Sequence, residues 1–392
     1  MLWDHYVFRR GAGVHSLWEQ IHRKRALKIL YIAGRGFDVR AQAVMREYVG
    51  TLQSNSFEVS EAKLLLVGFA GYELEQDIVD ITEENAAELT NIFSPIGQVE
   101  TVIIGQSSVD DENDLSATNA LRLGVQKILA MVDGHTDIVL DVSSLPRVAY
   151  LALLTSILNK LVPNKVSKVG GAHPLFANGV NFQVLVAEDA ELDGHIQAED
   201  PSSELVQIPG FSGGFHLESA KDWPMVWFPI LGEHRVNQLE KVLSSSEIPR
   251  EAEICPVVPH PSNNPRRADN LLVEYQVPLF KSRRTPTSNI VYVHESNPFE
   301  AYRQLLSAMR RFQQSMKVLG NCRLVVTPLG SKLVTVGAGL ACFEMRPESS
   351  NASYRVAVPL AEPKRYVAQI KNLRESKPEI SALLLTGEAF SV

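Results

Sequence analysis

Short apolar runs that end abruptly in polar loops recur along the first half of the chain. The first run, residues 27–33, is followed by a loop that begins at Gly34 and then by helix-forming residues from Ala41 to Tyr48. Similar runs lie at residues 63–69, 101–105, 137–142 and 182–187, with helical composition at 82–92 and 116–132. Strands that alternate with helices in this way predict βαβ units and a parallel sheet.

The alternation of predicted strands and helices stops after residue 205 and resumes near Asn289. The middle segment is rich in proline, glycine and tryptophan, which favours extended and turn structure, apart from one helix near His234–Leu243. Apolar runs at 290–293, 323–327 and 354–358, with helices from Pro298 and from Ser331 to Phe343, predict further α/β structure. A chain of 392 residues also exceeds the roughly 250–300 residues at which single cores stop growing.

The sequence therefore predicts an α/β protein in two parts. We expect a Rossmann-like parallel-sheet domain over residues 1–205, a Pro/Gly-rich connecting segment over 206–288, and a second, smaller α/β unit over 289–392.

Composition excludes several classes of protein. With 45% hydrophobic and 21% charged residues the chain is an ordinary globular protein, and its net charge of −7 argues against a broad nucleic-acid-binding surface. The longest apolar stretch, residues 148–158, falls short of the roughly 20 residues that cross a bilayer, and the first residues lack the pattern of a signal peptide. We expect no membrane partner.

The cysteines and histidines predict neither disulfides nor a metal site. Cys255, Cys322 and Cys342 are odd in number and widely spaced, and no histidine falls into an HExxH or Cys–His ligand spacing. Reduced cysteines favour a cytoplasmic location. The sequence leaves the cofactor undetermined.

The loop after the first predicted strand, Gly34-Arg35-Gly36-Phe37-Asp38-Val39-Arg40, is the first candidate site. Open α/β sheets bind ligands where strands end and helices begin, and helix amino termini attract anions. Gly34 and Gly36 would let a phosphate approach the backbone, and Arg35 and Arg40 would clamp it. The third glycine of a dinucleotide fingerprint is replaced by Val39. The alternative is a tight turn in which Asp38 caps the helix.

Two further strand ends are unusually polar. Residues 141–147 place Asp141, Ser143, Ser144 and Arg147 after a predicted central strand. The structural alternative is that Ser144 caps the following helix and Pro146 lies in its first turn. Residues 327–332 place Gly330, Ser331 and Lys332 before a helix, without the glycine and lysine order of a P-loop. The alternative for Ser331 is a plain helix cap.

Glu295 is a third acidic candidate, after Asp38 and Asp141, for acid/base chemistry. It follows the predicted strand 290–293, and its loop would share a rim with Lys332 if that strand neighbours 323–327. A glutamate at a helix start is alternatively a partner of the helix dipole.

The motif Gly34-Arg35-Gly36-Phe37-Asp38 after a strand resembles the Gly-Asn-Gly-Phe-Asp segment of AbiH-like abortive-infection proteins, which are themselves similar to sirtuin-like Rossmann folds. Arg35 replaces the family's asparagine. Residues 327–332 are similar in layout to ligand loops of CRISPR-associated Rossmann-fold sensors, which bind cyclic oligonucleotides. A wider set of motifs resembles a group of bacterial Rossmann-like proteins: residues 141–147, Leu231-Gly-Glu233, Asn297-Pro-Phe-Glu-Ala-Tyr-Arg303, residues 328–332 and the terminal Leu-Thr-Gly-Glu.

These features lead to one hypothesis and two alternatives. The first is a bacterial, nucleotide-recognising protein of antiviral defence, in which the loops 34–40, 141–147 and 330–332 line one cleft. Arg40, Arg147 and Lys332 would hold phosphate there, and Asp38 or Asp141 would hold ribose or base. An enzyme would instead hydrolyse a nucleotide or an N-glycosidic bond in the same cleft, with Asp38, Asp141 or Glu295 as acid or base. A non-catalytic scaffold would bind a partner protein through the middle segment. Homo-oligomers are compatible with all three.

Overall fold

The computed structural model describes the chain except for residues 24, 71, 106–115, 163–172, 190–196, 202–204, 212–221, 245–247, 347–355, 368–373, 376 and 392. The described residues form two compact units. The large unit comprises Leu2–Gln197 and Arg365–Val392, and the inserted unit comprises Ala198–Lys364. The chain passes between the units at β7 (Gln197–Pro201) and β16 (Pro363–Val367), which pair as a two-stranded sheet.

The large unit contains a seven-stranded sheet with the order β1-β17-β6-β5-β2-β3-β4. Its strands are β1 (Val7–Arg10), β2 (Leu27–Gly34), β3 (Val59–Phe69), β4 (Gln98–Ile104), β5 (Asp137–Asp141), β6 (Asn181–Glu188) and β17 (Glu379–Thr386). Strands β2 to β6 are parallel, β17 is antiparallel to β6, and β1 is antiparallel to β17. The chain builds outward from β2 through β3 to β4 and then returns to β5 on the other side of β2. The strand order therefore reverses between β2 and β5.

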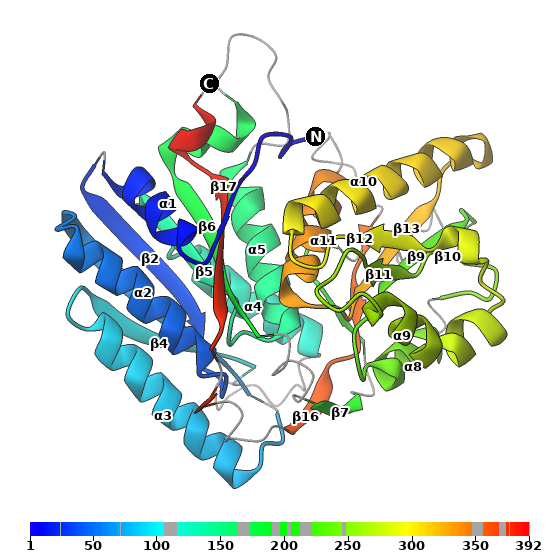
Figure 1. Ribbon diagram of the computed structural model, residues 1–392, viewed down its shortest axis with the longest axis horizontal. Coiled ribbons are helices and arrows are strands. Elements are labelled where there is room, and N and C mark those ends of the chain that lie inside the picture. Colours follow the sequence, from blue (N-terminus) through cyan, green and yellow to red (C-terminus); the bar gives the residue numbers. More distant parts are fainter. Residues whose placement is uncertain are drawn as a thin grey trace. The chain divides into compact units, whose positions relative to one another are not determined.

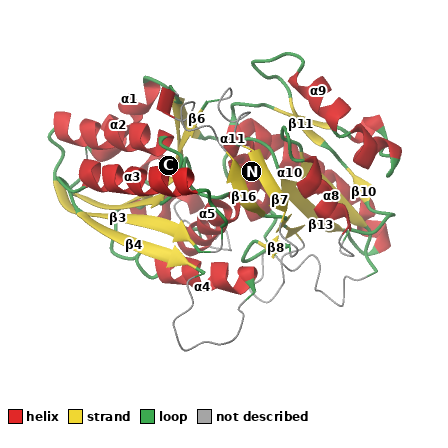
Figure 2. Cartoon of the chain, turned by 90° about the horizontal axis from the view of Figure 1, so that it is seen from below, coloured by secondary structure: helices red, strands yellow, loops and turns green. Residues whose placement is uncertain are grey.

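Helices cover both faces of this sheet (Figures 1 and 2). On one face lie α1 (Gly13–His22), α2 (Arg40–Ser54) and α3 (Gln76–Phe93), and on the other lie α4 (Ala117–Leu129) and α5 (Arg147–Leu161). The apolar stripes of α1 and α2 pack on the sheet around the aromatic rings of Trp18, Tyr31 and Tyr48. Helix α5 is buried around its whole circumference from Val148 to Thr155, as its unbroken apolar sequence requires.

The inserted unit repeats this topology. Its sheet has the order β12-β11-β9-β13-β14, with β10 also paired to β9, and every pair is parallel. The strands are β9 (Met225–Ile230), β10 (Glu253–Ile254), β11 (Val257–Pro259), β12 (Val291–Val293), β13 (Arg323–Pro328) and β14 (Val356–Ala357). The chain runs from β9 to β12 and then returns to β13, beside β9. The order therefore reverses between β9 and β13.

Helices cover both faces of the second sheet too. Helices α8 (Val236–Ser244) and α9 (Arg267–Glu274) pack around Trp227 in one core cluster, and α10 (Pro298–Ser315) packs with α11 (Lys332–Glu344) on the other face. A small sheet of β8 (Val206–Gln207) and β15 (Pro359–Leu360) completes the pairing. Short helical turns lie at Pro174–Gly179, Gln276–Lys281, Thr287–Asn289, Met316–Leu319 and Glu388–Phe390.

The predicted α/β class and the Rossmann-like parallel sheet are confirmed, but the chain divides differently from the predicted boundaries. The segment 206–288 contains β9, the central strand of the second sheet, and the segment 289–392 contains β17, which pairs in the first sheet. The sequence did not predict β9 as a central strand, because Pro229 lacks the amide hydrogen that a central strand normally donates. That residue lies where β10 has ended and β11 has barely begun, so no ladder hydrogen bond is lost.

Candidate functional site

Two of the three predicted loops meet where the strand order of the large unit reverses. Strands β2 and β5 are neighbours, so their carboxyl ends bring Gly34 and Ser144 together. The Ser144 hydroxyl donates to the Gly34 carbonyl at 2.8 Å. A Cβ atom at Gly34 would stand 2.5 Å from the Ser144 carbonyl oxygen, and one at Gly36 would stand 2.7 Å from it. The neighbouring backbone therefore leaves no room for a side chain at either glycine, independently of any ligand that binds there.

Asp38 and Arg40 form a buried ion pair inside the first loop. The Arg40 guanidinium donates to both carboxylate oxygens of Asp38, through Nε at 2.8 Å and Nη2 at 2.6 Å. The Asp38 Oδ1 atom also accepts from the Arg40 backbone amide at 3.2 Å, which ties it to the start of α2. A phosphate that reached Arg40, as predicted, would have to compete with Asp38 in the interior.

Side chains of α3 hold the outer part of the same loop. Asn85, which is fully buried, donates through Nδ2 to the Gly36 carbonyl at 2.6 Å. Arg35 donates to both oxygens of Glu83, at 2.5 and 2.6 Å, and the Glu83 side chain remains 58% exposed. This second pair is open to exchange with solvent, so Arg35 can turn to an anionic ligand at a small cost in stability.

The side chains of Asp141 and Ser143 are buried and form hydrogen bonds with other groups of the protein. The Asp141 carboxylate accepts from the Tyr31 hydroxyl at 3.0 Å and from the Ser143 amide at 2.9 Å, and the Ser143 hydroxyl accepts from the Ala187 amide at 2.9 Å. Burial raises the pKa of Tyr31, and the charge of Asp141 raises it further, so the phenol keeps the proton that it donates.

Helix α5 begins at Arg147, immediately outside this meeting of strands. Its first turn contains no acidic residue, and its N-cap, Pro146, makes no side-chain capping bond. The amide groups at the start of a helix have no partners within the helix, and the helix dipole gives them a partial positive charge. This helix start therefore presents donors of the kind that bind phosphate.

The third predicted loop belongs to the inserted unit and has the same design. Ser331 caps α11 by accepting from the Val334 amide at 3.4 Å, which confirms its structural alternative, and Lys332 is the first residue of the helix. A Cβ atom at Gly232, after β9, would overlap the Leu329 carbonyl after β13. In both units, then, a glycine at or just after the end of one strand (β2 or β9) packs on a carbonyl just after the neighbouring strand (β5 or β13), and a basic residue opens the next helix.

Glu295 is also held by partners. Its carboxylate accepts from Arg267, which bonds Glu233 as well, at 2.5 and 2.8 Å, and it accepts from the Asn263 amide at 2.7 Å. Burial raises the pKa of Glu233, but the hydrogen bonds and charge of Arg267 outweigh it, so that this pKa is lowered. Strands β12 and β13 are not neighbours, because β11 and β9 lie between them.

Sequence reasoning missed Asn85 and Arg267. Both lie on helices and hold loops distant in sequence, and neither belongs to a motif. The three cysteines are free and buried, and burial raises the pKa of Cys255 and of Cys342 to about 12. Neither of these two thiols is ionised at neutral pH.

Two further observations concern only the part of the chain that the structure describes. It contains no group of three or more histidine, cysteine, aspartate or glutamate side chains able to hold a metal ion. It also contains no helix with the length and apolar character needed to cross a membrane.

Comparisons with known proteins identify neither a family nor a ligand for this chain. No protein-family profile matches the chain, and no curated protein does. A solved structure with some likeness is that of a candidate UDP-N-acetylglucosamine 2-epimerase from Listeria monocytogenes, at 12% identity and a TM-score of 0.23, over 79% of this chain and 76% of that one. A likeness at that TM-score assigns neither ligand nor reaction to this chain.

Proposed function

We propose that this chain recognises a phosphate-bearing nucleotide and that its phosphate lies at the amino end of α5. The observation that carries the proposal is the start of that helix at Arg147, without a side-chain cap or a first-turn acid, where the strand order reverses between β2 and β5. Doubly wound sheets bind nucleotides at such reversals, outside the carboxyl ends of the strands. Arg147 and the exchangeable Arg35 supply the positive charge.

Binding is favoured over hydrolysis by the state of the predicted acids. Asp38 is paired with Arg40, Asp141 bonds Tyr31 and Ser143, and Glu295 is paired with Arg267. A general base must be within reach of the proton that it abstracts and must be able to accept it. Carboxylates that already satisfy interior donors are poorly suited to that work. The resemblance of residues 34–38 to abortive-infection proteins supports phage defence as the cellular setting.

The test is nucleotide-dependent thermal stabilisation. Purified protein is mixed with ATP, NAD or cyclic oligonucleotides, and its melting temperature is measured together with that of Arg147→Ala. We expect a shift with at least one nucleotide and its loss in Arg147→Ala. Arg46→Ala is the matched control, because Arg46 forms an exposed pair with Glu88 in the same unit. The absence of any shift, or an equal shift in both variants, would contradict the proposal.

Two additions to the same experiment separate the alternatives. Chromatography of the mixtures for nucleotide products distinguishes a binder, which leaves them intact, from a hydrolase. Lys332→Ala tests the inserted unit by itself. We expect it to reduce stabilisation less than Arg147→Ala does, because Ser331 already occupies one amide donor at the start of α11.

A further inference from the structure

Two side chains of α3 hold the loop of residues 34–40, one in the interior and one at the surface. Asn85 is fully buried and donates to the carbonyls of Gly36, at 2.6 Å, and of Asp38, at 3.4 Å. Its own oxygen accepts from Gln42 of α2 at 2.9 Å. Buried hydrogen bonds are costly to break. They fix the backbone of the loop, so a rearrangement on ligand binding is confined to its side chains.

The surface contact turns the Arg35 side chain away from the proposed phosphate site. Strand β3 lies beside β2 on the side opposite β5. Arg35 packs over Gly68 of β3, since a Cβ atom added there would lie 3.7 Å from the Cβ and Cδ atoms of Arg35. Its Nη2 atom lies 2.5 and 2.6 Å from the two carboxylate oxygens of Glu83. The side chain therefore lies over β3, whereas α5 follows β5.

The backbone of Arg35, in contrast, lies beside the proposed site. Its neighbours Gly34 and Gly36 both pack on the Ser144 carbonyl, three residues before the start of α5. Neighbouring strands of a sheet lie about 4.8 Å apart, a distance that a long arginine side chain covers by rotation about its own bonds. Arg35 can therefore reach either its partner on α3 or a phosphate at α5. Because the two lie on opposite sides of β2, one guanidinium serves one of them at a time.

We propose that Glu83 competes with the nucleotide phosphate for Arg35 and so lowers the affinity of the site for anions. The inference rests on the proposed function, because it concerns the same phosphate at the start of α5. Binding exchanges the pair of Arg35 and Glu83 for a pair of Arg35 and phosphate. The released carboxylate is readily hydrated, since the Glu83 side chain is already 58% exposed. Glu83 thus regulates the site through Arg35 and does not itself contact the ligand.

Removal of the Glu83 charge should tighten nucleotide binding. Wild type, Glu83→Gln, Arg35→Ala and the double variant are titrated by calorimetry with ATP, NAD and cyclic di-AMP. We expect Glu83→Gln to bind about twofold to fivefold more tightly, which corresponds to the strength of an exposed ion pair. Arg35→Ala should bind about tenfold more weakly, because a hydrogen bond to a charged group is lost.

The double variant separates competition from simple repulsion. If Glu83 acts only through Arg35, the change Glu83→Gln has no effect once Arg35 is absent. The double variant should then bind as weakly as Arg35→Ala. A gain of the same size with and without Arg35 would show that Glu83 repels anions at a distance, and it would overturn the inference.

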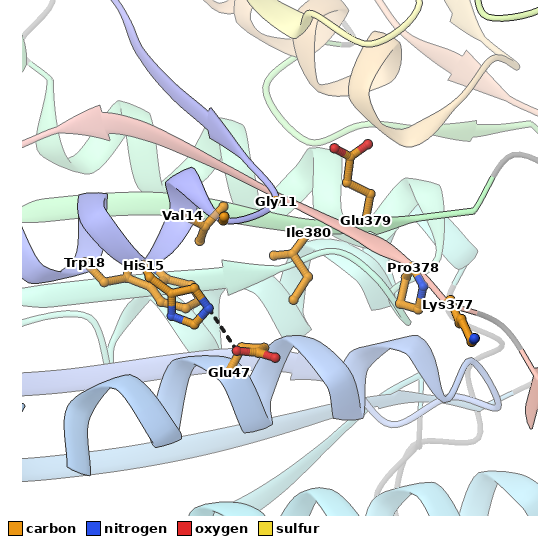
Figure 3. Close-up of a pocket in the computed structure, with 10 residues that line it drawn as sticks. Gly11, Val14, His15, Trp18, Glu47, Lys377, Pro378, Glu379 and Ile380 are labelled. Carbon is orange, nitrogen blue, oxygen red and sulfur yellow. Dashed lines mark ion pairs between the residues drawn. The ribbon is translucent and has the colours of Figure 1, made fainter. Parts of the chain in front are cut away.

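Glu47→Gln is the matched control for the lost charge. Glu47 is a half-exposed glutamate of α2, and its Oε2 atom lies 3.0 Å from His15 Nε2. Figure 3 shows this pair in the hollow between α1, α2 and the start of β17. Because the pair joins α1 to α2, the variant should bind nucleotides as the wild type does. An equal gain in Glu47→Gln would contradict the role of Glu83.

The outcomes also distinguish this inference from the proposed function. If the wild type binds a nucleotide and Glu83→Gln binds it equally or more weakly, the competition is wrong and the phosphate site stands. If neither binds any of the three nucleotides, the proposed function fails and the competition fails with it. The altered side chains lie at the surface, and circular dichroism verifies that the variants fold.

Discussion

Charged side chains in both units do much of their work by holding loops. Arg267, the first residue of α9, connects the loop after β9 through Glu233 with the loop after β12 through Glu295. Its side chain is only 19% exposed, so each carboxylate gains a strong partner, and the pKa of Arg267 is itself raised by the two carboxylates despite its burial. Removing one partner from a largely buried pair leaves the other charge uncompensated, which costs far more than breaking a surface pair.

Arg267→Met should therefore destabilise the inserted unit at neutral pH by about 3 kcal/mol. The pKa of Glu233 is lowered in the folded state, so its contribution is present above the ordinary carboxyl pKa and is lost as pH falls through the lowered value. Acidification below about pH 4 should consequently destabilise the wild type more than Arg267→Met. Urea unfolding followed by tryptophan fluorescence at both pH values measures the difference.

The control is Arg303→Met, because Arg303 forms a more exposed pair with Glu300 on α10. Its cost should stay below about 1 kcal/mol at either pH. Equal costs for the two arginine variants at neutral pH would show that Arg267 does not hold the loops together.

At the scale of elements, a backbone contact joins two neighbouring strands at their carboxyl ends in each sheet, β2 with β5 and β9 with β13. Gly34 packs on the Ser144 carbonyl and Gly232 packs on the Leu329 carbonyl, and neither contact has room for a side chain. Because the two strands approach each other closely at these glycines, the contacts fix where the following helices begin. They therefore also set the positions of the amino ends of α5 and α11.

Gly34→Ala should destabilise the large unit by about 1–3 kcal/mol, because its Cβ would overlap a backbone carbonyl that is unable to move aside cheaply. Gly50→Ala is the matched control. Gly50 lies within α2 with no atom within 4 Å of an added Cβ, so alanine there should stabilise by about 0.5–1 kcal/mol. Thermal unfolding of the two variants should shift in opposite directions, and a stabilised Gly34→Ala would contradict the close contact.

Most parallel strands and their helices follow from periodicity, and the polar strand ends follow from their residues. β2, β5 and β13 are short apolar runs that end in turn-forming residues, and this pattern predicts buried strands. β9 was not predicted, because a proline argues against a central strand. Pro229 is tolerated there because neither β10 nor β11 pairs with β9 at that residue. The partners of the predicted site residues, such as Asn85 for Gly36, depend on tertiary contacts that no local pattern encodes.

For the whole molecule, the decisive feature is that one unit is inserted in the sequence of the other. The inserted unit is one continuous segment, whereas the large unit needs both ends of the chain. Strand β17 lies between β6 and β1 and hydrogen bonds to both. The predicted second unit, residues 289–392, would therefore include a strand of another sheet and lack β9.

Residues 198–364 should fold when expressed alone, because all strands of their sheet lie within that segment. Residues 2–197 and residues 289–392 should not, since the first fragment lacks β17 and the second lacks β9 and β11. Amide chemical-shift dispersion in two-dimensional NMR spectra distinguishes the outcomes. A well-dispersed spectrum for 289–392, or a collapsed one for 198–364, would contradict this division.

The pairing of β1 with β17 also sets an order of events at the ribosome. Trp3 donates through its indole nitrogen to the Leu385 carbonyl at 3.1 Å, so a residue that is synthesised before the inserted unit pairs with one that is synthesised after it. Domains commonly fold in the order in which they emerge, but here the segment that emerges second is the first to be complete. Until β17 has been synthesised, β6 has an unpaired edge, which is a template for pairing with another chain.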